Sequence, residues 1–195
     1  PGINSIALEW LWIIDLNEDP ATGYLLIDYP GRGECEGSMR PEENYRNSEG
    51  ALQALAEQFG LERLTARLAL LGHSFGSGAA LQFASHRLVE SIVLVAPFND
   101  LKQAVRQKSL LLSLLMPSQI DNRELLREIL SRPFPPRITI LHGERDQALP
   151  VTMAEDLAAV APDQIDFYRF ADDDHVNILS RRRQFIFEAL NGKED

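Results

Sequence analysis

Short apolar runs alternate with amphipathic stretches along most of this chain. Four runs rich in leucine, isoleucine and valine have the length of buried strands, at 24–27, 68–71, 92–96 and 138–141. A fifth run, 165–170, includes Asp166 and Arg169, and charged residues within an apolar strand favour the edge of a sheet. Apolar residues at helical spacing predict helices over 5–16, 49–59, 75–86, 151–161 and 177–190.

This alternation predicts an α/β fold in which a mostly parallel sheet carries helices on both faces. Residues 1–195 have the length of a single domain. The stretch 99–136 departs from the pattern, because it contains two or three short helical segments and no strand. We expect this stretch to be a small helical cap inserted over the mouth of the site. The alternative is a helical crossover that packs on the sheet.

The segment Gly72-His73-Ser74-Phe75-Gly76 joins a predicted strand to a predicted helix in the pattern Gly-x-Ser-x-Gly. A serine on so sharp a bend holds a strained backbone, which typically costs ~1–3 kcal/mol. Gly72 and Gly76 flank the serine because a Cβ there would collide with the neighbouring strand or helix. The bend exposes the hydroxyl above the sheet, so we interpret Ser74 as a nucleophile; the alternative is a plain glycine-rich turn.

A serine hydroxyl needs a base within hydrogen-bond reach. The chain has four histidines. His73 adjoins Ser74 in sequence but is expected to point elsewhere, His86 lies at a helix end, and His142 follows a strand. His175 lies in a polar loop between the last strand and the last helix, where a loop can deliver an imidazole to Ser74. We therefore predict that His175 is the base.

The imidazole in turn needs an acid to orient it. Asp146 follows the strand 138–141, and the chain order Ser74, Asp146, His175 matches the Ser-Asp-His order of one fold class. Asp100, which follows the preceding strand, is the competing acid. Residues 172–174 are all aspartates, and we expect them to form a solvated acidic loop. The alternative is that their charge raises the pKa of the neighbouring imidazole.

Acyl transfer also needs N–H donors aimed at the developing oxyanion, each worth about 2.7–4 kcal/mol. The backbone N–H of Phe75, directly after the nucleophile, is the first expected donor. The second should come from the loop before the first helix, which here is Pro1-Gly2-Ile3. Pro1 has no N–H, so Gly2 is the candidate.

The formal net charge of −10 argues against nucleic acid and anionic membrane surfaces as main partners. Cys35 is the only cysteine, so no intrachain disulfide and no cysteine metal site are expected. One free thiol fits a reducing compartment, and we expect a cytoplasmic location. The chain has no apolar run of about 18 residues, so no transmembrane helix is expected.

Four motifs together resemble the α/β-hydrolase superfamily, in order and over nearly the whole chain. They are Asp28-Tyr29-Pro30-Gly31-Arg32-Gly33, the Gly72–Gly76 segment, Leu141-His142-Gly143-Glu144-Arg145-Asp146, and the loop around His175. The short cap is similar to that of the small-lid hydrolases of the BEM46-like and serine-aminopeptidase-like groups. The resemblance implies Ser74 as nucleophile, Asp146 as acid and His175 as base.

The chain departs from the family pattern at three places. Asp174 stands where the family often has a glycine, and Cys35 stands where the glycine-rich turn often has a serine. The family also has a central strand and a His-Gly-containing oxyanion loop directly before the first helix, and no such strand precedes Gly2 here. The hypothesis is that residues 1–195 are a fragment, or that the preceding strands are supplied elsewhere.

We expect a serine hydrolase that acts on a small-molecule carboxylic ester, needs no metal or organic cofactor, and can form a homo-oligomer. The apolar residues 110–112, 114, 115 and 116 indicate either an acyl pocket or ordinary packing. One alternative is a peptidase or amidase of the same fold, with Asp121, Glu124 or Glu128 holding the substrate amine. Another is a non-catalytic binding protein.

Overall fold

A four-stranded parallel sheet forms the centre of the molecule. The computed structural model describes residues 2, 5–14, 22–38, 40–60, 68–108 and 120–192. Its strands are β1 (Ala69–His73), β2 (Ser91–Val95), β3 (Arg137–Gly143) and β4 (Ile165–Phe170), in the spatial order β1-β2-β3-β4. Every pairing is parallel, so all four carboxyl ends meet at one edge of the sheet. The predicted parallel sheet is confirmed.

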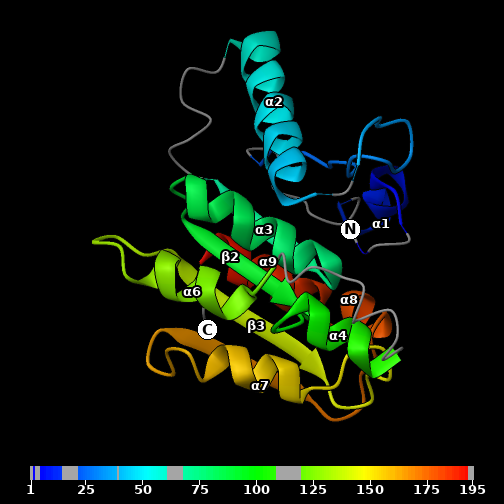
Figure 1. Cartoon of the computed structure of the whole chain (residues 1–195), viewed down its shortest axis with the longest axis vertical. Helices are drawn as coiled ribbons and strands as arrows, with labels where there is room; N and C mark the ends of the chain where they lie inside the picture. The colour runs from blue at the N-terminus through cyan, green and yellow to red at the C-terminus, as the bar shows by residue number, and fades with distance from the viewer. Residues whose placement is uncertain are drawn as a thin grey trace.

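Helices alternate with these strands, as the spacing of apolar residues predicts (Figure 1). The helices are the 3-10 helix η1 (Ala7–Trp10), α1 (Leu11–Ile14), α2 (Pro41–Phe59), α3 (Phe75–His86), α4 (Leu101–Lys108), α6 (Asn122–Leu130), α7 (Thr152–Ala158), α8 (Asn177–Arg181) and α9 (Arg183–Asn191). Within the described ranges, no helix is both long enough and apolar enough to cross a bilayer.

Different helices cover the two faces of the sheet. Successive side chains of a strand point to opposite faces, so Ile92 and Leu94 of β2 contribute to one core and Val93 and Val95 to the other. The first core is completed by α3, α6 and α7, and the second by η1, α1, α8 and α9. In Figure 1 α6 and α7 lie in front of the sheet and α9 lies behind it.

The predicted strand 24–27 is wrong. These residues pair with no strand among the described residues, and Leu26 instead packs against the second core. An apolar run becomes a strand only where a neighbouring backbone accepts its hydrogen bonds. The predicted helix over 5–16 is also divided, since its described part forms η1 followed by the short α1.

The stretch 99–136 contains two described helices, α4 and α6. Leu126, Ile129 and Leu130 of α6 belong to the first core, as expected of a crossover helix that packs on the sheet. The apolar residues 110–116, interpreted above as a pocket or as packing, lie outside the described residues. The extent of a cap within 99–136 stays a prediction.

The junction of β1 with α3 requires a glycine at position 72. A Cβ on Gly72 would lie 2.5 Å from the carbonyl oxygen of Gly76 and 2.8 Å from the Cα of Ser77. Because backbone atoms cannot move aside cheaply, we expect Gly72→Ala to lower the free energy of unfolding by about 1–3 kcal/mol, measured by urea denaturation.

Gly50→Ala is the matched control. Gly50 lies inside α2 with open space around it. Alanine forms helix better than glycine, so this substitution should raise the free energy of unfolding by about 1 kcal/mol. Equal effects of the two substitutions would contradict the close approach of β1 to α3.

Candidate active site

Ser74 lies on a strained bend between β1 and α3. Its backbone angles are φ 54° and ψ −119°, and a non-glycine residue at positive φ typically costs ~1–3 kcal/mol. Two neighbours hold the bend. The Ser74 N–H donates to the carbonyl of Val95 at 3.0 Å, and the hydroxyl of Ser77 donates to the Ser74 carbonyl at 2.6 Å. The bend therefore places the Ser74 hydroxyl at the carboxyl edge of the sheet.

A hydrogen-bond chain connects Ser74, His175 and Asp146. The Nε2 of His175 lies 3.0 Å from the Ser74 Oγ, and its Nδ1 lies 2.7 Å from the Asp146 Oδ2. An ionised carboxylate only accepts, so the Nδ1 carries the proton and the Nε2 is left to accept from the serine hydroxyl. The structure thus brings together the three residues that the sequence singled out, from loops at three strand ends.

The Asp146 carboxylate is buried and accepts several hydrogen bonds. Its Oδ1 accepts from the N–H of Ala148 at 2.7 Å and of Leu149 at 2.8 Å. Burial by itself would raise the pKa of Asp146, but hydrogen bonds from His142, His175 and the Leu149 N–H outweigh it and hold that pKa well below its usual range. Asp146 is therefore ionised in the folded protein at neutral pH.

His142 also contacts Asp146, which sequence reasoning missed. The side chain is fully buried, and its Nε2 lies 2.9 Å from the Leu149 carbonyl and 3.2 Å from the Asp146 Oδ2. Because both atoms only accept, the Nε2 carries the proton. The signal was available in the sequence, since His142 and Asp146 are four residues apart across one turn at the end of a strand.

The loop before His175 is anchored by a buried ion pair rather than solvated as predicted. Asp173 is fully buried, and its carboxylate lies 2.7 Å from the Nε of Arg181 and 2.6 Å from the Nε of Arg182. A Cβ on Gly143 would collide with the carbonyl oxygen of Asp173. The glycine thus lets the loop cross close to the end of β3, beside the loop that carries Asp146.

Asp174 accepts hydrogen bonds from the turn that leads into α8. Its Oδ1 accepts from the N–H of Val176 and of Asn177, each at 2.9 Å, and these hydrogen bonds lower the pKa of Asp174. Asp172 is the exposed aspartate of the three and pairs with Arg145 at 2.5 Å. The three aspartates therefore have different structural roles. Asp174, where the family often has glycine, stabilises the turn at the start of α8.

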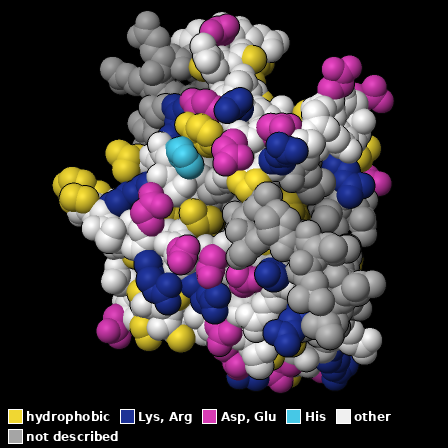
Figure 2. All heavy atoms as spheres, viewed as in Figure 1, with side chains coloured by type: hydrophobic (Ala, Val, Ile, Leu, Met, Phe, Trp, Pro, Cys, Tyr) yellow, Lys and Arg dark blue, Asp and Glu magenta, His cyan; other side chains and the backbone are white. Residues whose placement is uncertain are grey.

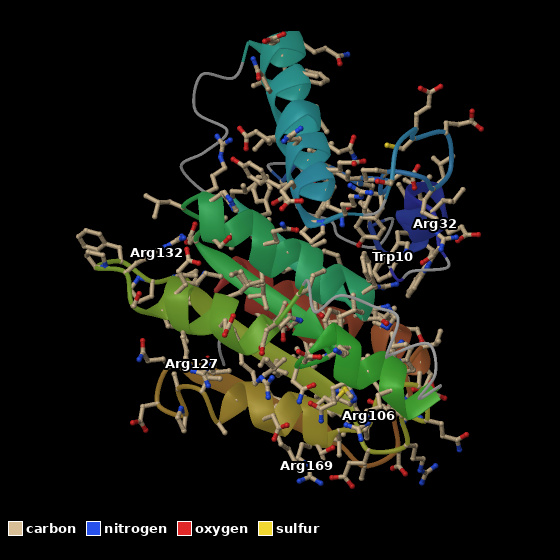
Figure 3. All side chains as sticks on the ribbon, in the orientation of Figure 1. Trp10, Arg32, Arg106, Arg127, Arg132 and Arg169 are labelled. Carbon is tan, nitrogen blue, oxygen red and sulfur yellow. The ribbon has the colours of Figure 1, made fainter. Side chains whose placement is uncertain are left out.

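His73 points toward His175, not elsewhere as the sequence led us to expect. Its Nε2 lies 2.7 Å from the His175 carbonyl oxygen, and the two rings are 4.8 Å apart. The ring of Trp10 lies 5.6 Å from the His73 ring; Figure 3 places Trp10 on the N-terminal helical segment beside α1. His73 is only 6% exposed, so its surroundings are almost wholly protein.

The two expected oxyanion donors occupy different surroundings. Phe75 is the first residue of α3, where backbone N–H groups have no partner within the helix, and its ring packs edge-on against Tyr29 at 5.2 Å. Gly2 lies against His73, since a Cβ on it would be 3.5 Å from the His73 Nδ1. The carbonyl of Gly2 accepts from the N–H and hydroxyl of Ser5. The roles of both donors stay predictions.

The competing acids are engaged elsewhere. The Asp100 Oδ1 accepts from the Gln103 N–H at 2.7 Å, so Asp100 caps α4 rather than orienting His175. Asp121 accepts from the Arg123 Nε at 3.0 Å and terminal nitrogen at 2.7 Å. The hydrogen bond from Arg123 lowers the pKa of Asp121 and neutralises its charge, which weakens the case for Asp121 as an amine-binding group.

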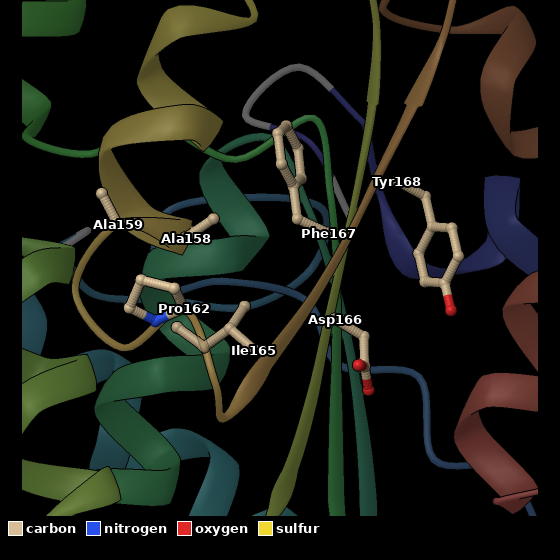
Figure 4. Close-up of a pocket in the computed structure, with 7 residues that line it drawn as sticks. All are labelled: Ala158, Ala159, Pro162, Ile165, Asp166, Phe167 and Tyr168. Carbon is tan, nitrogen blue, oxygen red and sulfur yellow. The ribbon is translucent and has the colours of Figure 1, made fainter.

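Two surface cavities lie in the described part of the chain. One, of about 500 Å³, lies between α7 and β4 and is lined by Ala158, Ala159, Pro162, Ile165, Asp166, Phe167 and Tyr168 (Figure 4). It opens at the start of β4, whereas the triad lies at the carboxyl ends of the strands. The other, of about 640 Å³, is lined by Asp100, Lys102, Gln103, Arg106 and Arg123.

Neither cavity includes a residue of the triad. On the face shown in Figure 2, acidic and basic side chains are interspersed without a large area of one sign. The hydrogen-bond geometry, rather than a cavity, therefore locates the candidate active site.

Comparisons with known proteins agree with this fold. The model of the alpha/beta hydrolase family matches residues 2–172. Two uncharacterized proteins of Mycobacterium tuberculosis, Rv2307c of strain H37Rv and MT2364 of strain CDC 1551, are each 30% identical to this chain over 139 residues. The match covers 70% of this chain and 47% of each relative, so the chain spans about half the length of the curated relatives it matches.

Solved structures with this fold include several hydrolases. The 2,6-dihydroxy-pseudo-oxynicotine hydrolase has a TM-score of 0.72 at 20% identity, over 100% of this chain and 60% of its own. An esterase domain from Rhodothermus marinus has a TM-score of 0.54 at 20% identity, and the match covers 76% of this chain and 66% of the esterase domain. A puromycin-hydrolyzing peptidase of Mycobacterium tuberculosis has a TM-score of 0.56 at 18% identity, and the match covers 75% of this chain and 25% of the peptidase. At these identities the likeness shows the fold.

The lowered pKa of Asp146 predicts a pH-dependent stability. The unfolded carboxyl titrates near its ordinary pKa of 3.8, and the folded one below it, so in acid the unfolded chain binds the proton first. The stabilisation from this carboxylate is complete above about pH 4 and is lost as the pH falls toward the folded pKa. The difference in unfolding free energy between wild type and Asp146→Asn should therefore shrink between about pH 4 and pH 2 in urea denaturation.

Asp172→Asn is the control for this measurement. Its side chain is 62% exposed, and exposed ion pairs contribute little to stability. The difference between wild type and this variant should stay small and nearly constant over the same pH range. A difference for Asp146→Asn that also stays constant would argue against the ionised, hydrogen-bonded carboxylate.

Proposed function

This chain belongs to the alpha/beta hydrolase family, and on that premise we propose that it is a serine hydrolase that cleaves carboxylic esters. The observation that carries the proposal is the continuous hydrogen-bond chain from the Ser74 hydroxyl through His175 to Asp146. The proposed nucleophile, base and orienting acid lie within hydrogen-bond distance of one another, which supports acyl transfer.

The reaction proceeds in two halves. The Ser74 Oγ attacks the ester carbonyl while the His175 Nε2 takes the hydroxyl proton, and the imidazolium then gives that proton to the departing alcohol. A water molecule attacks the acyl-enzyme by the same route, with His175 first as base and then as acid. Asp146 stays ionised throughout, holding the Nδ1–H tautomer and stabilising the imidazolium.

The charge that develops on the substrate oxygen needs donors that are already in place. The Phe75 N–H at the start of α3 is the first proposed donor, supported by its position directly after Ser74 and by the helix dipole. Gly2 is proposed as the second donor. Each such donor typically contributes about 2.7–4 kcal/mol to transition-state stabilisation. The strained Ser74 backbone is consistent with this use, because strain persists where function requires it.

Removal of the nucleophile tests the proposal directly. Ser74→Ala should lower kcat for a short-chain p-nitrophenyl ester by ~10⁶, which is the typical loss when a triad serine is removed. A fluorophosphonate probe should label the wild-type protein and not this variant. Ser85→Ala is the matched control, because Ser85 lies on the same helix but donates to the Gln82 carbonyl. Ester hydrolysis that survives in Ser74→Ala would end the proposal.

The alternative of a peptidase or amidase makes a different prediction. An aminopeptidase needs a free carboxylate to hold the substrate amine. Of the three candidates, Asp121 is paired with Arg123 and Glu128 with Arg132. We therefore expect kcat/KM for a p-nitrophenyl ester to exceed that for an aminoacyl p-nitroanilide, and Asp121→Asn to leave that ratio unchanged. A higher kcat/KM for the anilide would favour the peptidase, and a protein that resists the fluorophosphonate probe would favour the non-catalytic alternative.

A further inference from the structure

Two consecutive residues of the bend hold His175 at two different atoms. Ser74 meets its ring at the Nε2, at 3.0 Å, while His73 meets its main-chain carbonyl oxygen, at 2.7 Å. His73 is the last residue of β1 and is therefore part of the sheet. The loop that delivers His175 is thus tied to the rigid end of the strand that also positions the nucleophile.

The hydrogen bond fixes the protonation of His73. A carbonyl oxygen only accepts, so the His73 Nε2 must carry the hydrogen. The Nδ1 is buried and has no hydrogen-bond partner among the described residues. Gly2, which has no side chain, lies against it, since a Cβ on Gly2 would be 3.5 Å from this nitrogen. The ring is therefore held as the Nε2–H tautomer. A second proton, on the Nδ1, would have no hydrogen-bond acceptor among the described residues.

We propose that His73 is a positioning residue that, as a neutral Nε2–H donor, anchors the main chain of His175 so that its imidazole reaches Ser74. This inference rests on the proposed function of the Ser74, His175 and Asp146 site. His73 touches neither the nucleophile's oxygen nor the substrate carbonyl in this role. It acts through the backbone of the catalytic base.

The charges around His73 favour the same neutral state. Burial, followed by the neighbouring His175, lowers the pKa of His73 to about 4. Among the groups that act on it, the His175 ring opposes a positive charge, whereas the hydrogen bond to the His175 carbonyl and the Asp146 carboxylate favour one; Trp10 and Gly2 are uncharged. The anchor therefore persists when His175 becomes an imidazolium during turnover, because the ring beside it carries no charge.

A matched pair of substitutions separates this hydrogen bond from packing. In His73→Gln the side-chain amide nitrogen stands the same number of bonds from Cβ as the histidine Nε2, so it can still donate to the His175 carbonyl. His73→Met has the same length and no donor. A loss of positioning by about an ångström typically costs ~10² in rate, so we expect kcat to fall about 10- to 100-fold in the methionine variant, with KM unchanged.

The glutamine variant should recover most of that loss, to within about three-fold of wild type, and should be labelled by the fluorophosphonate probe at a similarly restored rate. His86→Met is the control, since His86 is exposed at the end of α3 and should leave both rates unchanged. Equal losses in the glutamine and methionine variants, with both still folded by circular dichroism, would overturn the anchoring role.

A second measurement does not depend on catalysis. The ¹⁵N shifts of the His73 ring in wild-type protein should show the neutral Nε2–H tautomer from about pH 5 to pH 8. An Nδ1–H tautomer, or titration within that range, would overturn the inference whether or not the protein hydrolyses esters. If Ser74 proves unreactive, the proposed function fails while this measurement still decides the state of His73.

Discussion

The hydrogen bond between the Asp146 carboxylate and the Nδ1–H of His175 is the interaction on which the rest of the site depends. At 2.7 Å it fixes the tautomer of the imidazole and leaves the Nε2 free to accept from Ser74. It also joins two loops that follow different strands, β3 and β4. Because parallel strands end at one edge, a single hydrogen bond there can bring together residues that are 29 positions apart in the chain.

The fold supports that interaction by holding the strand ends in unusual backbone states. Ser74 after β1 and Ala96 after β2 are the two non-glycine residues with positive φ in the described ranges, at 54° and 47°. Each is tied to the next strand, Ser74 to the Val95 carbonyl and Ala96 to the Leu141 carbonyl. The strain is therefore concentrated where the chain leaves the sheet, and the ladder of β1, β2 and β3 holds it in place.

Buried charge is compensated in two separate ways at the same edge. Asp146 is surrounded by donors that are formally neutral, including two backbone N–H groups and two imidazoles. Asp173 instead has two guanidinium groups, from Arg181 and Arg182. A carboxylate stabilised mainly by neutral donors keeps its attraction for a transient imidazolium, whereas a carboxylate between two arginines serves to hold a loop.

The pattern of apolar and polar residues was sufficient to predict those helices and strands whose bounds depend on nearby residues. The helix over 75–86 and the strand over 165–170 match their predicted bounds, because apolar spacing and chain reversals are local properties. The strained bend at Ser74 could also be predicted from the sequence, because a Gly-x-Ser-x-Gly segment between a strand and a helix is typical of such a bend.

Tertiary structure alone decided what depends on distant neighbours. The apolar run 24–27 is not a strand, because no described strand pairs with it. Asp173 is buried in an ion pair with Arg181 of α8 and with Arg182, which lies between α8 and α9. His73 and His142 belong to the site because the folded chain brings the loop of His175 against His73 and the turn of Asp146 against His142. A sequence shows which side chains have donors and acceptors, but which of them meet is determined by how the sheet aligns the ends of its strands.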